Sequence, residues 1–306
     1  MKKTFLIYFF LLITGLFLLV SLSCASHPYI EPQAEELQYP AESYIPEKLD
    51  WQEVEPGIER FDFKNPAFPV IYHAVKIDLE SQDLEIVSFP DTEFAKKSAR
   101  DGKMPEPYIY TGITTARFAK KYKCAVAVNA TPFAGRNGKW DLIAHVSSTR
   151  QLVSVHIDDS FRIAPPRSSY AALTISRSEN GFTAQIIDSQ NSEAFEDCDF
   201  AFGGFFTVLR DGQINEKFIR NHDSRTGCGV SQDGKTLYLL VVEGEVQSKS
   251  EGLSYPQCAA VFKAMGCDDA LEFDGGGSSQ LCINGKSVLT YRKYRVQGNS
   301  FGFRKM

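Results

Sequence analysis

The segment 270–285, ALEFDGGGSSQLCING, places a carboxylate, three consecutive glycines and two hydroxyls directly after an apolar run that is typical of a strand. A glycine run of this kind either forms a hairpin turn or turns its backbone N–H groups inward as an anion-binding nest. In the second case Ser278 and Ser279 add hydroxyl donors beside Asp274. Neither common nucleotide phosphate loop fits, because no lysine follows Gly277 closely and no GxGxxG opens a helix. The nest is therefore expected at a sheet edge.

Two further polar residues stand beside strand-like runs. Arg225 comes just before one such run, and Asn129 ends another. Taken alone, Arg225 is typical of solvated surface and Asn129 of a turn cap. Arg225 and Asn129 become candidates for a functional site only if the fold brings them close to the triple glycine.

The elements that must position these residues are mostly strands. Alternating or continuous apolar runs predict strands, and helical spacing occurs at 111–123 and 254–267, the latter stopped by Gly266. No internal repeat is present. We predict a single β-rich α+β domain over residues 67–306, with a mixed or antiparallel central sheet and a few flanking helices. The predicted strands are 70–79, 83–89, 124–130, 152–157, 171–176, 183–188, 236–244, 270–274 and 300–305.

The composition is that of an ordinary globular protein. The 306 residues are 43% hydrophobic and 23% charged, with a formal net charge of -5. A nucleic-acid partner is not expected, because binding to a phosphate backbone normally requires a basic face.

The N-terminus predicts export. Residues 1–24 carry two lysines, a long apolar run and then small residues around Cys24, as in a secretory signal peptide. The sequence before Cys24 is similar to a lipobox, with Ser21 in place of the usual leucine. We expect a lipoprotein anchored to a membrane of the cell envelope through Cys24, and an uncleaved apolar helix is the alternative.

Between this signal and the domain, residues 25–66 are rich in proline and glutamate. This composition favours a tether. Tyr44, Ile45 and Trp51 are also consistent with a strap that packs on the domain.

Six cysteines remain once Cys24 is set aside, and none forms a CxxC pair. A zinc site is not expected from this spacing. An exported protein can form disulfides, and Cys258 and Cys267 either bridge or are simply buried.

Five segments in this order resemble the phosphodiester glycosidase family: CAVAVNATPF, FAFGGFFTVLRDG, SRTGCGVSQDGKTLYLLVVEG, EGLSYPQCAAVFKAMGCDDALEFDGGGSSQLCING and YRVQGNSFGFR. The resemblance covers about residues 70 to 304 and is most specific from Arg225 to Ser279. It implies hydrolysis of a sugar-1-phosphodiester at the glycosidic bond, with an N-acetylglucosamine-like sugar. The matching positions are Asn129, Phe133, Gly204, Arg225, Thr226, Asp274, Gly275, Gly276, Gly277, Ser278, Ser279, Arg295 and Asn299.

The chemistry of this reaction suits these residue types. A glycosyl phosphate already carries a good leaving group, so the site must hold an anionic phosphate and place a carboxylate at the anomeric carbon. Arg225 and Arg295 offer forked donors to phosphate. Asp274 is expected as nucleophile, charge stabiliser or ligand of a sugar hydroxyl, unless it only fixes the turn, and Glu243 or Glu272 as a second carboxylate. We expect Asp274, Glu243 and Arg225 to be catalytic and the other matching polar and glycine positions to bind substrate.

Some positions depart from the family pattern. The family's aspartate-glycine-arginine is Glu243 to Glu245 here, its asparagine-glycine-glycine is NATPF, and Ser224 stands where a proline precedes the arginine. Two hypotheses follow: an extracytoplasmic hydrolase acting on envelope or polysaccharide glycans, and a non-catalytic lipoprotein that binds a phosphosugar or glycan. No cofactor or catalytic metal is expected from the spacing of the histidines. A calcium ion bound by carboxylates and carbonyls is the open alternative.

Overall fold

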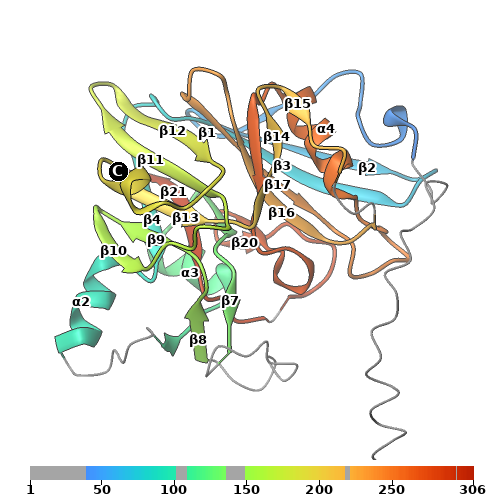
Figure 1. Ribbon diagram of the computed structural model, residues 1–306. Coiled ribbons are helices and arrows are strands. Elements are labelled where there is room, and N and C mark those ends of the chain that lie inside the picture. Colours follow the sequence, from blue (N-terminus) through green and yellow to red (C-terminus); the bar gives the residue numbers. More distant parts are fainter. Residues whose placement is uncertain (1–38, 101–108, 136–148, 218–220, 294) are drawn as a thin grey trace, which may run out of the picture. The chain divides into compact units, whose positions relative to one another are not determined.

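The computed structural model describes residues 39–100, 109–135, 149–217, 221–293 and 295–306. The predicted signal peptide, with Cys24, lies outside these residues. The described chain forms one unit, Tyr39–Met306, in which the strand pairs are antiparallel (Figure 1). The predicted α+β class with a β-rich sheet core is confirmed.

The largest sheet has eight strands in the order β1-β2-β3-β17-β16-β18-β14-β15. Its centre is the hairpin of β16 and β17, in which Arg225 pairs with Val242 and Val230 with Leu237. The strand that leads to Asp274, β18, lies beside β16. The bounds are β1 Gln52–Glu55, β2 Ile58–Asn65, β3 Val70–Asp78, β14 Phe206–Arg210, β15 Gln213–Ile214, β16 Arg225–Val230, β17 Thr236–Val242 and β18 Asp269–Glu272.

A second sheet, of five strands, has the order β20-β19-β6-β21-β4. Strand β21, Ser300–Lys305, pairs with the central strand β6 on one side and with the edge strand β4 on the other. The chain passes from the eight-stranded sheet into this one through the triple glycine, which joins β18 to β19. The other bounds are β4 Leu84–Phe89, β6 Val126–Asn129, β19 Leu281–Ile283 and β20 Lys286–Ser287.

A third sheet, also of five strands, and a small three-stranded sheet complete the described strands. One has the order β10-β9-β13-β11-β12 and the other β5-β8-β7. The single strand predicted at 152–157 is interrupted, because the N–H of Val153 donates to Pro132 O and that of Val155 to Gln190 Oε1. The bounds are β5 Tyr110–Thr111, β7 Phe133–Ala134, β8 Thr149–Leu152, β9 His156–Asp158, β10 Phe161–Ala164, β11 Ala172–Ser178, β12 Gly181–Ile187 and β13 Phe200–Gly203.

The main core lies between the three larger sheets. Alternate residues of β17, β18, β6, β21 and β13 point into it, as the period of two requires. Phe202 of β13 stacks on Phe301 of β21 at 4.2 Å between ring centroids, and Phe273 meets Phe301 edge-on at 6.0 Å. The loop that carries Asp274 is therefore anchored at Phe273 in the main core.

Three α-helices of the described residues cover outer faces of the sheets: α2 Thr92–Arg100, α3 Thr115–Tyr122 and α4 Tyr255–Met265. Helix α4 lies against β14 and β17 (Figure 1). It begins with a capping box between Ser254 and Gln257 and ends at Gly266, whose φ of 99° is the left-handed cap that glycine favours. Short 3-10 turns occur at Ala41–Ser43, Ser192–Phe195 and Gly276–Ser278.

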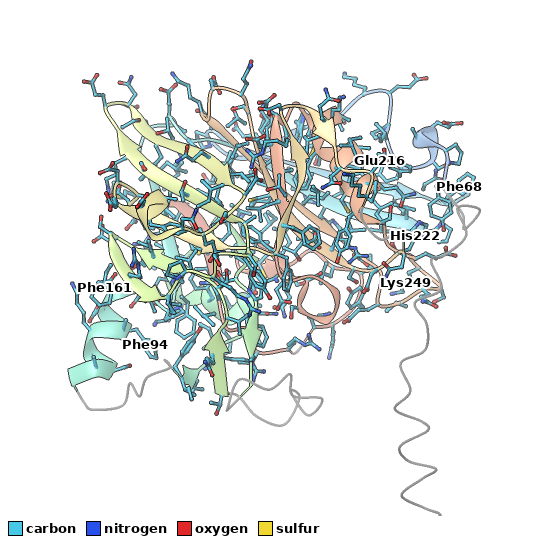
Figure 2. All side chains as sticks on the ribbon, viewed as in Figure 1. Phe68, Phe94, Phe161, Glu216, His222 and Lys249 are labelled. Atoms are coloured by element: carbon cyan, nitrogen blue, oxygen red, sulfur yellow. The ribbon has the colours of Figure 1, made fainter. Side chains whose placement is uncertain are left out.

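The segment before residue 67 contributes to the domain. Strands β1 and β2 extend the eight-stranded sheet at β3, and Tyr72 donates from its hydroxyl to Tyr44 O at 2.9 Å. Tyr39 contacts the rings of Phe68 and His222, which Figure 2 labels on neighbouring loops. Residues 39–65 therefore pack on the domain as strap and edge strands.

Among the residues that the structure describes, no helix combines the length and the apolar composition needed to cross a membrane.

All six cysteines of the described chain are buried free thiols. Cys258 and Cys267 lie nine positions apart along α4 and its cap, about 13 Å at 1.5 Å per residue, which is too far for a disulfide. Burial raises the pKa of the thiol of Cys124 to about 12 and of Cys198 to about 11, so the nucleophilic thiolate is scarce.

We expect the full chain carrying Cys24→Ser to show no thiol that reacts with an aromatic disulfide reagent while folded and six after unfolding in urea. Fewer than six after unfolding, restored by a reductant, would instead demonstrate a disulfide.

Candidate functional site

The triple glycine crosses from β18 to β19 as a tight turn. The N–H of Asp274 donates to Ala130 O at 2.9 Å and that of Gly276 to Ser224 O at 2.7 Å, while Ser278 and Ser279 donate within the turn. At most the N–H groups of Gly275 and Gly277 remain to face an anion, so the nest is smaller than the sequence suggested.

Glycine is required at two positions of this turn. Gly276 has φ +52°, in the left-handed region. A β-carbon on Gly277 would lie 2.6 Å from Nη2 of Arg295, so the absence of a side chain lets the guanidinium approach the backbone. Arg295 also donates from Nη1 to Ser278 Oγ at 3.1 Å. The structure thus brings together Asp274, the turn and Arg295, all of which match the family pattern in the sequence.

Asn129 holds the turn in place. Its Nδ2 donates to Asp274 O at 2.6 Å, and its Oδ1 accepts from the N–H of Gln280 at 2.8 Å and from Thr226 Oγ1 at 3.2 Å. Asn129 and Thr226 are 1% and 0% exposed. The structure places these two predicted substrate ligands beneath the site, where they fix the backbone of Asp274.

Two other predicted positions lie in the same supporting layer. Asn299 is buried and joins the N–H of Thr131 to Phe89 O. Gly204 lies where a β-carbon would be 2.6 Å from Glu272 O, so it permits close approach to β18. Phe133 packs beside Gly298 under the guanidinium of Arg150.

Arg225 lies deeper than Arg295. It is 5% exposed, donates from Nε to Leu253 O at 3.0 Å and from Nη2 to Asn221 O at 2.8 Å, and stacks on Tyr255 at 3.9 Å. Part of its donor fork is therefore used by backbone carbonyls.

Two carboxyl groups near the turn have raised pKa values. Burial raises the pKa of Asp274 to about 6, against the opposing effects of the Ser278 hydroxyl, Arg295 and Lys293. Burial raises the pKa of Glu272 to about 8, against Arg225. Glu272 is 2% exposed and its Oε1 has no partner among the described residues. Asp274 stays partly exposed, so it can both meet a ligand and exchange a proton near neutral pH.

Lys293 was not singled out from the sequence, and the structure places it at this site. Its side chain is 7% exposed and its Nζ lies 2.6 Å from Glu245 Oε1. Burial raises the pKa of Asp274, and the charge of Lys293 opposes this rise. The basic run around Arg295 was the only sequence signal. The ion pair balances the negative charge of Glu245, where the sequence departs from the family.

Glu243 directly follows the last residue of β17 and belongs to a buried hydrogen-bond network. Its Oε1 bonds to His73 Nε2 at 2.9 Å and accepts from the N–H of Thr290 at 2.8 Å, and its Oε2 accepts from Thr290 Oγ1 at 2.5 Å. Asp62 Oδ1 meets the other ring nitrogen of His73 at 2.8 Å. Glu243, 1% exposed, thus has both oxygens engaged.

This network predicts a pH-dependent stability. Desolvation lowers the pKa of His73, but its hydrogen bonds to Asp62 and Glu243 have the larger effect and raise that pKa above the ordinary 6.5. They do so because only the protonated ring can donate to both carboxylates. Its contribution is full below pH 6.5 and is lost as pH rises through the folded pKa. Hydrogen bonds from His73 and Thr290 outweigh burial and lower the pKa of Glu243 below 4.5, so its contribution is lost in acid.

We expect His73→Gln to cost about 3 kcal/mol in urea unfolding at pH 5.5 and clearly less at pH 8.5. His222→Gln is the matched control of opposite sign, because burial lowers the pKa of His222; its wild-type residue should contribute more at the higher pH. An equal loss for His73→Gln at both pH values would contradict the charged network.

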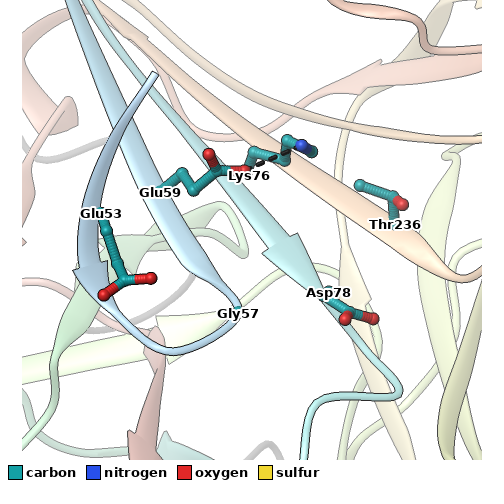
Figure 3. Close-up of a pocket in the computed structure, with 6 residues that line it drawn as sticks. All are labelled: Glu53, Gly57, Glu59, Lys76, Asp78 and Thr236. Carbon is teal, nitrogen blue, oxygen red and sulfur yellow. Dashed lines mark hydrogen bonds and ion pairs between the residues drawn. The ribbon is translucent and has the colours of Figure 1, made fainter.

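A surface hollow lies at the other end of the eight-stranded sheet (Figure 3). It is lined by Glu53, Gly57, Glu59, Lys76, Asp78 and Thr236, and Lys76 pairs with Glu59 at 2.8 Å. Thr236 begins β17, whereas Asp274 lies beyond the end of the sheet where β17 finishes, about 20 Å away at 3.3 Å per residue. The hollow is separate from the site around Asp274.

Within the described ranges, one group of acidic residues has ligand atoms close enough to share a cation: Asp211, Asp268 and Asp269. Asp269 already pairs with Arg210 at 2.5 Å and accepts from the N–H of Asp211. This group lies near the β14–β15 turn and does not adjoin Asp274.

Comparison with known proteins gives the family. Residues 122–304 match the phosphodiester glycosidase family model, so the chain belongs to the phosphodiester glycosidase family. No curated protein matches.

Solved structures share the fold. The catalytic domain of zebrafish N-acetylglucosamine-1-phosphodiester alpha-N-acetylglucosaminidase, auto-inhibited by its pro-peptide, is 16% identical over 83% of this chain and 86% of that chain, with a TM-score of 0.57. A hypothetical protein from Synechocystis is 14% identical over 82% of this chain and 62% of that chain, with a TM-score of 0.55. A protein from Burkholderia pseudomallei is 14% identical over 76% of this chain and 74% of that chain, with a TM-score of 0.54.

Proposed function

We propose that this protein is an extracytoplasmic hydrolase that cleaves a sugar-1-phosphodiester at the glycosidic bond, with an N-acetylglucosamine-like sugar, in envelope or polysaccharide glycans. The observation that carries the proposal is the partly exposed carboxyl of Asp274, with its pKa raised to about 6, beside the guanidinium of Arg295 and near Lys293. A carboxylate next to two cations is what a glycosyl phosphate requires.

In this proposal Arg295, Lys293 and the free N–H groups of the glycine turn hold the phosphate. The C1–O bond breaks with its electron pair moving to the phosphate oxygen, which leaves as a phosphomonoester. The oxygen of a water molecule bonds to C1, and its proton passes to Asp274. Arg225, Asn129 and Thr226 support the turn from below.

The proposed location rests on the N-terminal sequence, where lysines precede an apolar run and Cys24. Acylation of Cys24 anchors the chain to a membrane in this proposal. Cys24→Ser should then release the protein from the membrane fraction, and retention would favour an uncleaved helix.

The competing function is a phosphosugar-binding lipoprotein without catalysis. The specific observation in its favour is that Glu243 has both oxygens engaged and Arg225 donates to two backbone carbonyls, so two residues expected to be catalytic serve the structure.

The deciding experiment is hydrolysis by the purified full-length protein of an aryl α-N-acetylglucosamine-1-phosphodiester, beside a panel of other sugar-1-phosphodiesters. Release of a phosphomonoester supports the hydrolase. Binding of a sugar-1-phosphate without turnover of any substrate would establish the binding protein. The proposal needs no cofactor, so EDTA should leave the rate unchanged, and loss of rate restored by calcium would add that ion.

A further inference from the structure

We propose that Asp223, rather than Glu243 or Glu272, is the second carboxylate of the site and faces the anomeric carbon of the bound sugar; this rests on the function proposed above. Asp223 lies two residues before Arg225 and was not singled out from the sequence. Its side chain is partly exposed.

Elimination among the neighbouring carboxylates points to Asp223. Glu243 is 1% exposed with both oxygens bonded, and Glu272 is 2% exposed beneath the turn. Glu245 is engaged by Lys293 and Glu251 by Tyr39. Around the turn, within the described residues, Asp223 and Asp274 remain partly exposed without an ion pair at hydrogen-bonding distance.

The orientation of the Asp223 carboxylate suits this role. Its Oδ1 accepts from the N–H of Ser224 at 2.7 Å, which fixes the side chain. Its Oδ2 lies 3.8 Å from where a β-carbon on Gly276 would be, and it accepts no hydrogen bond from the described residues. One oxygen is thus anchored while the other borders the glycine turn two residues after Asp274.

The backbone of Asp223 is held unusually closely. It forms a β-bridge with Leu253. A β-carbon on Gly252 would lie 2.1 Å from Asp223 O, and one on Gly244 would lie 2.6 Å from Asp223 C. Two glycines from different segments therefore allow the chain to close around this residue, which preorganises its carboxylate.

The charge of Asp223 reaches the groups that surround the site. Burial is the main cause of the raised pKa of Tyr291 and of Tyr255, and the charge of Asp223 adds to it; burial lowers the pKa of Lys293, and the charge of Asp223 opposes this. Asp223 therefore lies within electrostatic reach of Lys293, and its Oδ2 borders the same glycine turn that Arg295 contacts, so a sugar whose phosphate is held by these cations lies beside Asp223 in this proposal.

With two carboxylates the roles divide. As the C1–O bond breaks and its electrons move to the phosphate oxygen, positive charge develops at C1, and Asp223 stabilises it without forming a bond. Asp274 takes the proton of the attacking water. No general acid is needed, because the departing oxygen belongs to a phosphate.

The test is Asp223→Asn in the full chain, which keeps an oxygen for the N–H of Ser224. We expect kcat/KM to fall by about a hundred-fold or more with an unchanged melting temperature. Glu251→Gln is the matched control, since it removes a charge from the segment packed on Asp223 and should leave the rate nearly unchanged.

A second readout does not depend on turnover. Binding of a protonated iminosugar of N-acetylglucosamine configuration, measured by calorimetry, should weaken at least ten-fold in Asp223→Asn, while binding of neutral N-acetylglucosamine should change little. Wild-type turnover that persists in Asp223→Asn overturns this inference and leaves the hydrolase intact. If the wild-type protein turns over no substrate but binds the iminosugar more tightly than Asp223→Asn does, the proposed hydrolase function is rejected. The placement of Asp223 beside the sugar is then kept. Equal iminosugar binding by both proteins overturns the inference.

Discussion

Asp274→Asn lowers kcat/KM for a sugar-1-phosphodiester by about a thousand-fold with little change in stability. The reason is that only the side-chain carboxyl is altered, while the backbone groups that hold residue 274 in the turn remain bonded to Asn129 and Ala130. An amide can neither accept the proton of water nor carry negative charge. Initial rates of phosphomonoester release, with thermal unfolding measured in parallel, check this.

The pH profile adds a second criterion. Because burial raises the pKa of Asp274 to about 6, wild-type kcat/KM should climb as pH rises through about 6 and then level off. Asp50→Asn, at an exposed position on the strap, is the control and should retain the wild-type profile. An Asp274→Asn protein that keeps a tenth of the activity would show that this carboxyl only fixes the turn.

Arg295→Gln lowers kcat/KM by about a hundred-fold or more, because it removes the forked cation that holds the phosphate. Arg295→Lys should recover part of this loss, since a lysine restores the charge without the fork. The matched control is Arg117→Gln, at an exposed position of α3. Rates on a charged phosphodiester measure the effect.

Position and charge can be separated at the same place. Gly277→Ala leaves every charge unchanged, but its β-carbon would lie 2.6 Å from Nη2 of Arg295 and must displace the guanidinium. We expect a rate loss approaching that of Arg295→Gln. A normal rate in Gly277→Ala together with a slow Arg295→Gln would mean that the charge matters and its placement does not.

The sequence predicted most of the sheets because their strands alternate clearly, and it predicted α3 and α4 from spacing and end signals. Strand β2 was expected in the tether because it lies next to the edge strand β1 and carries partly or fully exposed charged residues such as Arg60 and Asp62. Such a strand shares the composition of a solvated linker. Helix α2 was missed because its apolar residues are few.

The site was predictable where a local signal existed. Three glycines after a strand identified the turn, and the family pattern led to Arg295. The engagement of Glu243 could not be read from the chain, since His73 lies 170 positions away. Asp223 was hidden for a similar reason: what distinguishes it is the approach of Gly244 and Gly252, and contacts of that kind exist only in the folded molecule.

Strand β21 bears on how the molecule forms. Residues 300–305 insert between β4 and β6, which lie about two hundred positions earlier in the chain. The five-stranded sheet therefore cannot form until nearly the whole chain has been synthesised. Arg295 lies just before this strand and reaches the turn only when it has docked. Pairing at such sequence separation folds slowly. An incomplete chain would therefore stay inactive and largely unfolded, which is compatible with the export proposed above.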